Sequence, residues 1–476
     1  MSSSKQPFLG HKMRRFRREL GLSQQEMADE LEISASYLSL IEHNQRPVTV
    51  PLLFKLGQAF QVDLRDFAED DQARLGTALK EVFSDPVFDG EGPRDTDIRE
   101  LAAASPAAAE AVILLYQRYR DLREESVSLE QQTGTRDGEG RGGLRLSPVE
   151  EVRDFLQAQS NHFPALEEAA EALWEAADLD PDALFQSLTD HLREVHGVGV
   201  RVVPHDVLDE TLRRFDFHRR RVLISELLPL PGRTFQLAAQ LAALAYREPI
   251  EALVDEAGLS GEEARRLAFT TLAGYFAGAV MMPYERFLAA AGEQRYDLDI
   301  LKARFNASFE QVCHRLTTLQ RQGARGVPFF FVRVDHAGNV SKRLSGAGFE
   351  FARFGGTCPR WVIYEAFLNP DRIMTQIAET PDKHRFLTIA RTVDSVRLGH
   401  GHRPPHLAVA VGCDLRHAAQ VVYADGMEQP AQHATPIGTA CRVCDRFDCT
   451  WRAHPPVSTR LRVDDNIRRI TPFSFS

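Results

Sequence analysis

The sequence has little of what marks a secreted or membrane protein. Only six cysteines occur among 476 residues, and no apolar segment follows the charged residues near the start, so neither a disulfide framework nor a secretory signal is expected. The most apolar run, Ala107 to Tyr116, is interrupted by Glu110 and is too short to cross a bilayer. These absences predict a cytoplasmic protein with no membrane partner.

The chain also lacks an excess of positive charge. Its 57 lysines and arginines stand against 67 acidic residues, a formal net charge of -10, which argues against nonspecific coating of DNA. One local exception lies near the start, where a basic patch that suits a polyanion is formed by Lys12, Arg14, Arg15, Arg17 and Arg18. The length is too great for one ordinary core and predicts about three domains.

Residues 22 to 46, LSQQEMADELEISASYLSLIEHNQR, have the pattern of two short helices joined by a tight turn. Ser23 and Glu26 can form a capping box on the first helix, and Ser34 can cap the second. Apolar positions recur at helical spacing at Leu22, Met27, Leu31, Ile33, Leu38 and Ile41. A second helix that begins with small polar side chains fits the major groove of DNA.

The S-Q-x-E-x-A and S-x-S-Y-L-S-x-I-E patterns in this stretch resemble the helix-turn-helix of lambda-type and Xre-type repressors. The resemblance implies a five-helix domain over residues 1–68 that binds a double-stranded operator. With the basic patch, it gives these expected DNA-binding residues: Arg14, Arg18, Gln24, Gln25, Ser34, Ser36, Tyr37, Ser39, Asn44 and Arg46. The alternative is a plain helical hairpin with capping serines, but the apolar pattern continues as the later helices require.

Composition divides the next part of the chain. Residues 69–123 are expected to form a helical connector, and residues 124–146, rich in glycine and charge, a flexible linker. A second domain follows over residues 147–295. Its expected elements are helices at 148–177 and 181–196, strands at 198–203 and 221–224 with a polar connection between them, and helices at 233–248 and 262–282.

This second domain resembles the ImmA/IrrE metallopeptidases, in which the first late helix carries a His-Glu-x-x-His zinc motif. The matching positions here are Ala239, Gln240 and Ala243, and the expected third ligand falls at about Leu272. Alanine cannot hold zinc, and an amide cannot take a proton from water. We therefore expect a degenerate, inactive peptidase-like domain.

Residues 296–476 are expected to form a small α+β sensor-like domain. The elements expected are a helix at 298–321, a hairpin with a glycine-asparagine turn, a helix at 371–377, and strands at 385–392 and 407–411. The G-G-T-C-P-R-W block at 355–361 and the cysteine-containing block at 441–453 resemble the short-chain fatty acyl transcriptional regulators. The fold class expected for the whole chain is mainly α with α+β parts.

That resemblance implies a short-chain acyl-CoA effector, with propionyl-CoA favoured. We expect it to bind between the first block and the peptidase-like helices, at Gly355, Gly356, Thr357, Cys358, Arg360 and Trp361. The glycines allow close backbone approach, the arginine suits a phosphate, and the tryptophan offers a flat face. The alternative is a surface arginine beside a core tryptophan.

The cysteines suggest a second site. A C-x-x-C turn places two thiolates on one side of a loop, as zinc or an iron-sulfur cluster requires. The candidate ligands are Cys413, Cys441, Cys444 and Cys449, with a structural role favoured over redox sensing. The alternative is a set of reduced cysteines packed in a loop-rich segment.

Together these patterns predict a transcription factor that binds an operator as a homodimer or higher homo-oligomer and responds to an acyl-CoA. Two other functions remain open at this point. One is a regulator that acts by metal-dependent proteolysis, and the other is a constitutive DNA-binding protein whose C-terminal part only dimerises.

Overall fold

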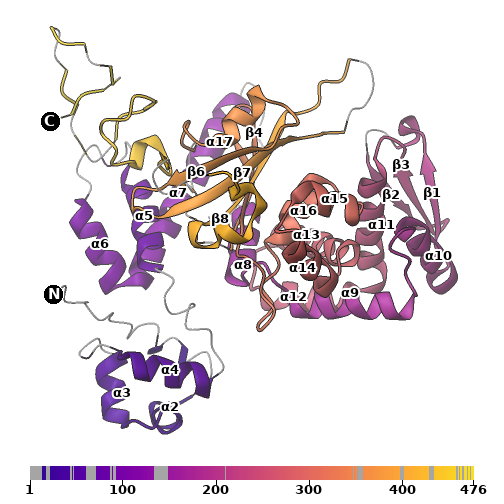
Figure 1. Ribbon diagram of the computed structural model, residues 1–476, viewed down its shortest axis with the longest axis horizontal. Helices are drawn as coiled ribbons and strands as arrows, with labels where there is room; N and C mark the ends of the chain where they lie inside the picture. The colour runs from indigo at the N-terminus through magenta and orange to yellow at the C-terminus, as the bar shows by residue number, and fades with distance from the viewer. Residues whose placement is uncertain are drawn as a thin grey trace. The chain divides into compact units, whose positions relative to one another are not determined.

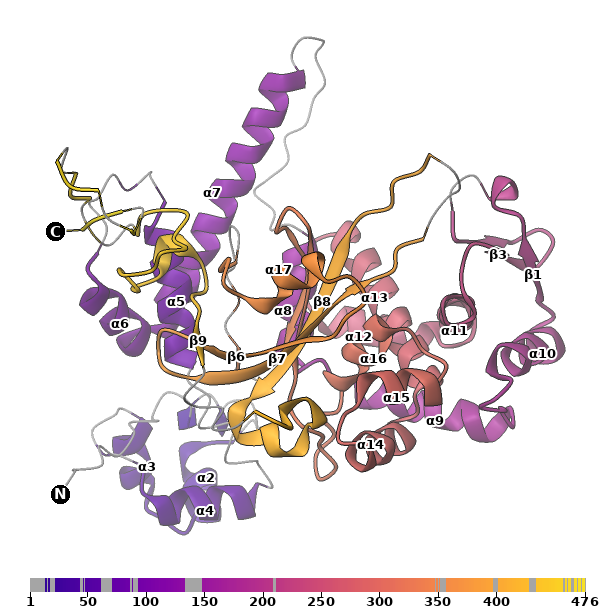
Figure 2. The same cartoon turned by 45° about the horizontal axis from the view of Figure 1, so that its top comes forward.

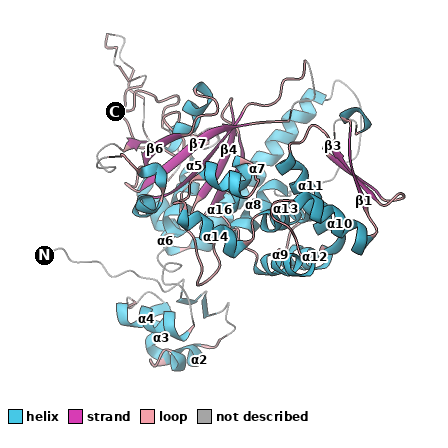
Figure 3. Ribbon diagram, turned by 45° about the vertical axis from the view of Figure 1, so that its right-hand side comes forward, coloured by secondary structure: helices cyan, strands magenta, loops and turns pink. Residues whose placement is uncertain are grey.

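The computed structural model describes residues 13–14, 16–17, 22–42, 46, 48–60, 71–85, 88, 93–132, 148–208, 211–346, 348–349, 351, 357–396, 401–427, 434–456, 459, 461–463, 466–468, 470–471 and 473–475. The chain forms two compact units, Met1–Arg74 and Leu75–Ser476. Helices and strands occur in the order and proportion of a mainly α protein with α+β parts, which confirms the expected fold class (Figures 1 and 3).

The first unit contains α2 (Gln24–Glu30), α3 (Ala35–Glu42) and α4 (Val50–Ala59). The predicted capping box is present at the start of α2, where the Ser23 hydroxyl accepts from the Glu26 amide and the Glu26 carboxylate accepts from the Ser23 amide. The helices bury a common apolar core made of Met13, Met27, Ala28, Leu31, Leu38, Ile41, Val48, Leu52 and Leu56. The expected fifth helix falls on residues outside those described.

The second unit begins with α5 (Asp71–Phe83, which starts in the first unit), α6 (Asp95–Ala104) and α7 (Pro106–Gln132). Residues 124–132 were expected to belong to a flexible linker, but they continue α7. They contain neither glycine nor proline and are rich in glutamate and glutamine, which have good helix propensity. Residues 133–147, which hold the glycines of that stretch, lie outside the described residues.

The peptidase-like part is mainly helical, with a small sheet at one side. Its helices are α8 (Pro148–Ala158), α9 (Pro164–Ala176), α10 (Leu184–His196), α11 (Leu230–Ala245), α12 (Arg247–Glu256), α13 (Glu262–Met281) and α14 (Tyr284–Glu293). Strand β1 (Gly199–Val203) pairs in parallel with β3 (Arg221–Ser225), as its position before a crossover requires. The predicted polar connection contains a further strand, β2 (Arg213–Asp216), antiparallel to β3.

Two predictions for the C-terminal part were wrong. The single helix expected at 298–321 is two helices, α15 (Leu298–Arg304) and α16 (Phe309–Leu316), because Asn306 has a φ of 44° and Ser308 caps a new helix. The helix expected at 371–377 is largely strand β6 (Met374–Glu379), whose backbone pairs with a neighbouring strand. A short helix, α17 (Val362–Glu365), occurs earlier instead.

A six-stranded sheet organises the C-terminal part, in the order β5-β4-β8-β7-β6-β9. Its strands are β4 (Phe330–Asp335), β5 (Val340–Ser345), β6, β7 (Arg385–Val393), β8 (Leu407–Asp414) and β9 (Thr435–Pro436). All neighbours are antiparallel except β6 and β9. Figure 2 shows these long strands, in orange, next to α16 and α17.

Both faces of this sheet are buried, so its side chains alternate between two cores. Phe331 and Val411 join the core of the peptidase-like helices, whereas Phe330 and Ala410 join a second core with α17. Glycine is required at position 412, because a Cβ there would lie 2.5 Å from the Phe330 ring and 2.5 Å from the Leu387 carbonyl oxygen.

No single described helix is long and apolar enough to cross a membrane. Helices α13 and α14 reach that length and composition only as a pair bent by 63°, and α13 is largely buried in the protein core.

A buried ion pair joins the peptidase-like helices to α16. Arg315 is 2% exposed and Glu167 1% exposed, and the guanidinium donates to both carboxylate oxygens at 2.5 and 2.8 Å. The Tyr275 hydroxyl also donates to Glu167, at 2.6 Å, and Arg315 Nε donates to the Met282 carbonyl. Burial alone would raise the pKa of Glu167, but the charge and hydrogen bonds of Arg315 outweigh it and lower that pKa.

We expect Glu167→Ala to lower the free energy of unfolding by about 3–5 kcal/mol, because Arg315 is left buried and unpaired. The matched control is Glu171→Ala, which removes the more exposed partner of Arg321 and should cost less than about 1 kcal/mol. Urea unfolding measures both. Because the folded-state pKa of Glu167 is lowered, its contribution is present above about pH 4.5 and lost as the pH falls through that lower pKa. Equal losses in the two variants would contradict this assignment.

Candidate DNA-binding and effector sites

The helix-turn-helix is held together by a buried carboxylate, Glu42, at the end of α3. Arg17 donates to it at 2.7 and 3.1 Å, Gln24 donates at 2.8 Å, and Arg14 Nε lies 3.6 Å away. Burial raises the pKa of Glu42, but these hydrogen bonds and charges outweigh that effect and lower it. Gln24 and Arg14 therefore both have a structural contact, and sequence reasoning missed the role of Arg17 and Glu42.

The remaining DNA-binding candidates differ in exposure. Gln25, Ser34, Ser36 and Arg46 are exposed, while Tyr37 and Ser39 are half-buried. The Ser34 hydroxyl accepts from the Tyr37 amide at 3.1 Å and so caps α3 as expected. Arg18 and Asn44 lie outside the described residues. The exposed side chains at the N-terminus of α3 are polar and small, which suits a groove of DNA.

Tyr37 has a second role. Its ring is one of the partly buried groups packed against the core of this unit. Substitution of Tyr37 would disturb packing as well as any contact to DNA, so Gln25 and Ser36 are the cleaner probes of the surface.

The peptidase-like helices carry no zinc-binding chemistry at the expected positions. Ala239, Gln240 and Leu272 are buried and Ala243 is half-buried in the contact between α11 and α13. Within the described residues, no group of three or more His, Cys, Asp or Glu side chains could hold a metal ion. These positions offer neither a metal ligand nor a general base.

The expected position of the acyl-CoA site is wrong in one respect. Cys358 and Trp361 belong to the core on the α17 side of the sheet, whereas α11 and α13 belong to the core on the other side. The sheet separates them, because alternate residues of its strands face opposite sides. A ligand cannot lie directly between the first block and the peptidase-like helices.

Trp361 is a core residue, as the alternative interpretation had it. It is 2% exposed, stacks on Phe349 with ring centroids 5.2 Å apart, and its indole nitrogen donates to the Thr388 hydroxyl at 3.4 Å. Its face is covered by protein, so it offers no open surface to an adenine ring. It instead belongs to an apolar cluster with Phe330 and Phe386.

Thr357 and Arg360 remain accessible members of the same block. Arg360 is half-buried, and its carbonyl accepts from the Gln376 side chain at 2.9 Å. Among the described residues, its guanidinium has no hydrogen bond or ion pair, so it keeps its capacity to bind a phosphate. The Thr357 hydroxyl is hydrogen-bonded to that of Tyr364. Gly355 and Gly356 lie outside the described residues.

The structure groups the cysteines differently from the expected set. Cys413 is fully buried in β8, in the core shared with the peptidase-like helices. Cys358, in contrast, lies near enough to Cys441 and Cys444 for their charges to affect its pKa. Burial is the main cause that raises the pKa of Cys358, and amides of Gly438 and Arg360 oppose it by donating to the sulfur.

The cysteine segment is fixed by a buried arginine, Arg452. Its guanidinium donates to the carbonyl oxygens of Cys441 at 2.7 Å, Cys444 at 2.8 Å and Arg446 at 2.8 Å. The turn that carries Cys441 and Cys444 is therefore held in place without a bound ion. Sequence reasoning did not identify Arg452, because the distances along the chain give no indication of these contacts.

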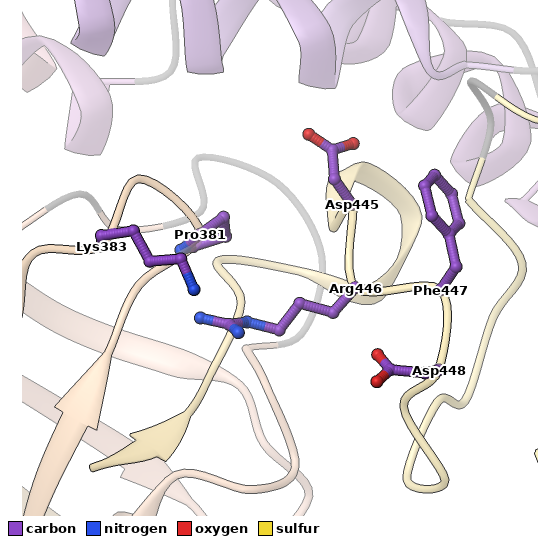
Figure 4. Close-up of a pocket in the computed structure, with 6 residues that line it drawn as sticks. All are labelled: Pro381, Lys383, Asp445, Arg446, Phe447 and Asp448. Carbon is purple, nitrogen blue, oxygen red and sulfur yellow. The ribbon is translucent and has the colours of Figure 1, made fainter. Parts of the chain in front are cut away.

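A pocket of about 430 Å³ lies beside this segment, lined by Pro381, Lys383, Asp445, Arg446, Phe447 and Asp448 (Figure 4). Its two cations are already engaged. Arg446 donates to the carbonyls of residues 379, 380 and 437, and Lys383 pairs with Glu379. Asp445 lies 3.3 Å from Lys80 of α5, which also pairs with Asp95 at 2.7 Å. The pocket therefore offers little free positive charge to a nucleotide.

Comparison with known proteins assigns each part of the chain. Residues 13–67 match a helix-turn-helix, residues 193–317 the IrrE N-terminal-like domain, and residues 318–473 the short-chain fatty acyl coenzyme A regulator, C-terminal. A solved structure of a Mycobacterium tuberculosis transcriptional regulator is 40% identical, with a TM-score of 0.66, and covers 69% of this chain and 99% of its own.

Full-length relatives agree with this assignment. The HTH-type transcriptional regulator RamB of Mycobacterium tuberculosis is 40% identical over 472 residues, 98% of each chain. The propionyl-CoA carboxylase regulator of Cereibacter sphaeroides is 39% identical over 98% of each chain, and the regulator PrpR of Mycobacterium tuberculosis 38% over 98% of this chain and 96% of its own. With the capped helix-turn-helix and the two-core C-terminal part, these matches show that the chain belongs to the short-chain fatty acyl coenzyme A regulators, a family of helix-turn-helix transcriptional regulators.

Proposed function

We propose that this protein is a transcriptional regulator whose operator binding responds to a short-chain acyl-CoA. The observation that carries the proposal is the presence, in one chain, of a helix-turn-helix and of the C-terminal domain that gives the short-chain fatty acyl-CoA regulators their name. Effector binding would shift the population between states of different operator affinity.

The operator contact is proposed to use Gln25, Ser36 and Arg46, with Arg14, Ser34, Tyr37 and Ser39 beside them. Gln25, Ser36 and Arg46 are exposed, and the core and the Glu42 network hold the two helices that carry the first two of these. Two copies of the chain would bind two half-sites, because helix-turn-helix proteins commonly read operators as dimers.

The double variant Gln25→Ala/Ser36→Ala should weaken operator binding and leave acyl-CoA binding unchanged. Each lost base or backbone contact costs on the order of 1 kcal/mol or more, which is roughly fivefold in affinity. Gel-shift titration measures the effect. A control with the same residue types, Gln186→Ala/Ser187→Ala in α10, should bind as the unmodified protein does, and equal affinity of all three proteins would place the DNA contact elsewhere.

The effector is proposed to bind on the α17 side of the sheet, at Thr357 and Arg360 and the residues before them. The half-buried Arg360 can hold a phosphate of coenzyme A, and the neighbouring apolar cluster can receive an acyl chain. A methylene is worth roughly 0.8 kcal/mol, or about fourfold in affinity. Selection of propionyl-CoA over acetyl- or butyryl-CoA would therefore be modest.

Arg360→Ala should weaken acetyl-, propionyl- and butyryl-CoA by a similar factor, because it removes a contact to the part they share. A charged hydrogen bond contributes about 1.5–3 kcal/mol, so the loss should be roughly tenfold or more. Calorimetric titration measures it, with Arg403→Ala, at an exposed position, as control. Unchanged affinities in Arg360→Ala would move the site, and no binding of any acyl-CoA to the intact protein would end the sensor proposal.

The cysteine segment is proposed to hold a structural zinc ion or iron-sulfur cluster, with Cys358 in place of Cys413 beside Cys441, Cys444 and Cys449. Three features support thiolates here: the amides that donate to Cys358, the amide of Arg446 that donates to Cys444, and the charges of Arg446 and Arg452 near Cys444. Such a group would fix the segment that contacts α5 through Lys80 and Asp445.

Metal analysis of protein purified without oxygen tests this assignment. Cys358→Ala and Cys444→Ala should each remove most of the bound metal, because each takes away one of four thiolates. Cys413→Ala should retain it, since Cys413 lies in another core. Metal loss on Cys413→Ala alone would restore the original ligand set, and an intact protein free of zinc and iron would overturn the proposal.

A peptidase function has no support from these residues, since the positions of its ligands and base hold Ala239, Gln240 and Ala243. A constitutive DNA-binding protein would differ from the proposed regulator in showing no response of operator affinity to any acyl-CoA.

A further inference from the structure

Helix α7 has one face that is fully used within its own chain. Ala109, Ile113 and Tyr116 are buried in a core with residues of α5 and α6, and the Tyr116 hydroxyl donates to Asp85 at 2.8 Å. These positions recur at intervals of four and three residues, as one face of a helix requires. Figure 2 shows α7 continuing well beyond the part that lies next to α5.

A second apolar stripe lies along the side of α7, about a third of a turn from the buried face. Its described members are Val112, Leu115 and Tyr119, of which Leu115 is 69% exposed and Tyr119 36% exposed. The sequence continues the same alternating spacing of three and four residues with Leu122, Ser126 and Leu129. Single exposed apolar residues are common on protein surfaces, but a repeat of seven over three turns or more is the pattern of a coiled coil.

We propose that this stripe pairs with the same stripe of a second copy of the chain, so that two α7 helices form an antiparallel coiled coil. The proposal rests on the proposed function, in which two copies bind one operator, and it names the surface that joins them. The occupant is a second copy because the charges that flank the stripe are self-complementary in only one orientation.

Those charges decide the orientation. With Val112 and Tyr119 at the first position of the repeat, Arg118 and Glu125 occupy equivalent flanking positions on one side, and Arg123 and Glu130 on the other. In a parallel pair, one side meets the other of the partner, so Arg118 would face an arginine and Glu125 a glutamate. In an antiparallel pair, Arg118 faces the partner's Glu125, and this occurs twice by symmetry.

The antiparallel register also aligns the apolar positions. Tyr119 falls opposite the partner's Leu122, and Leu115 opposite the partner's Ser126, about a two-fold axis between residues 120 and 121. Burial of Leu115 and its equivalents removes apolar surface from water, which is the main favourable term in such an association. The pairing would place two helix-turn-helix units in one complex, as a two-fold operator requires.

The first experiment measures the mass of the full chain in solution, without DNA or acyl-CoA, by sedimentation over a range of concentrations. The unmodified protein should be a dimer, and Leu115→Glu should weaken dimerisation at least tenfold, because it places like charges next to each other in the pair. Leu368→Glu is the matched control, since Leu368 is 81% exposed and lies far along the chain from α7. Circular dichroism of each variant confirms that it is folded.

Charge reversal tests the orientation. Arg118→Glu and Glu125→Arg should each weaken the dimer, and the double variant or a mixture of the two single variants should restore it. A parallel pair gives the opposite sign for Arg118→Glu, which would then strengthen association.

A monomeric intact protein, a dimer insensitive to Leu115→Glu, or a stronger dimer on Arg118→Glu would each overturn the proposal. Operator and acyl-CoA binding by the unmodified protein would still be measured separately, so failure here is distinguishable from failure of the proposed function.

Discussion

The arrangement of the C-terminal part depends on burial of both faces of one antiparallel sheet. Adjacent side chains of a strand point to opposite faces, so β4 sends Phe331 toward the peptidase-like helices and Phe330 toward α17. The peptidase-like helices thus act as the cover of one face, which accounts for their retention of an apolar frame without the catalytic residues. The other face is left to the block that contains Arg360 and Trp361, where we place the effector.

The parts of the fold that sequence could predict are those with strong local signals. The Ser23–Glu26 capping box, helix α13 and the hairpin of β4 and β5 each follow from short-range chemistry. Strand β2 was missed because Arg213–Asp216 carries little apolar character and is defined by its pairing with β3. The same reason explains β6, whose strand state comes from β7 rather than from its own residues.

The candidate sites divide in the same way. The sequence could place Ser34 at a helix start, but it could not show that Gln24 is committed to Glu42, eighteen residues later. It could recognise the C-x-x-C pair, yet not that Cys358 rather than Cys413 lies near it. Trp361 appeared suited to a ligand because of its neighbours in the chain, while its neighbours in space, such as Phe349, make it a core residue.

The contact between Lys80 and Asp445 has a consequence for the order in which the protein can fold. The two residues are 365 positions apart, so α5 can gain this contact only when synthesis of the chain is almost complete. The entropy cost of closing so long a loop must be met by the sheet and the peptidase-like core, which bring the ends together beforehand. During synthesis at a few to tens of residues per second, the helix-turn-helix therefore exists for roughly half a minute or more before α5 gains this contact.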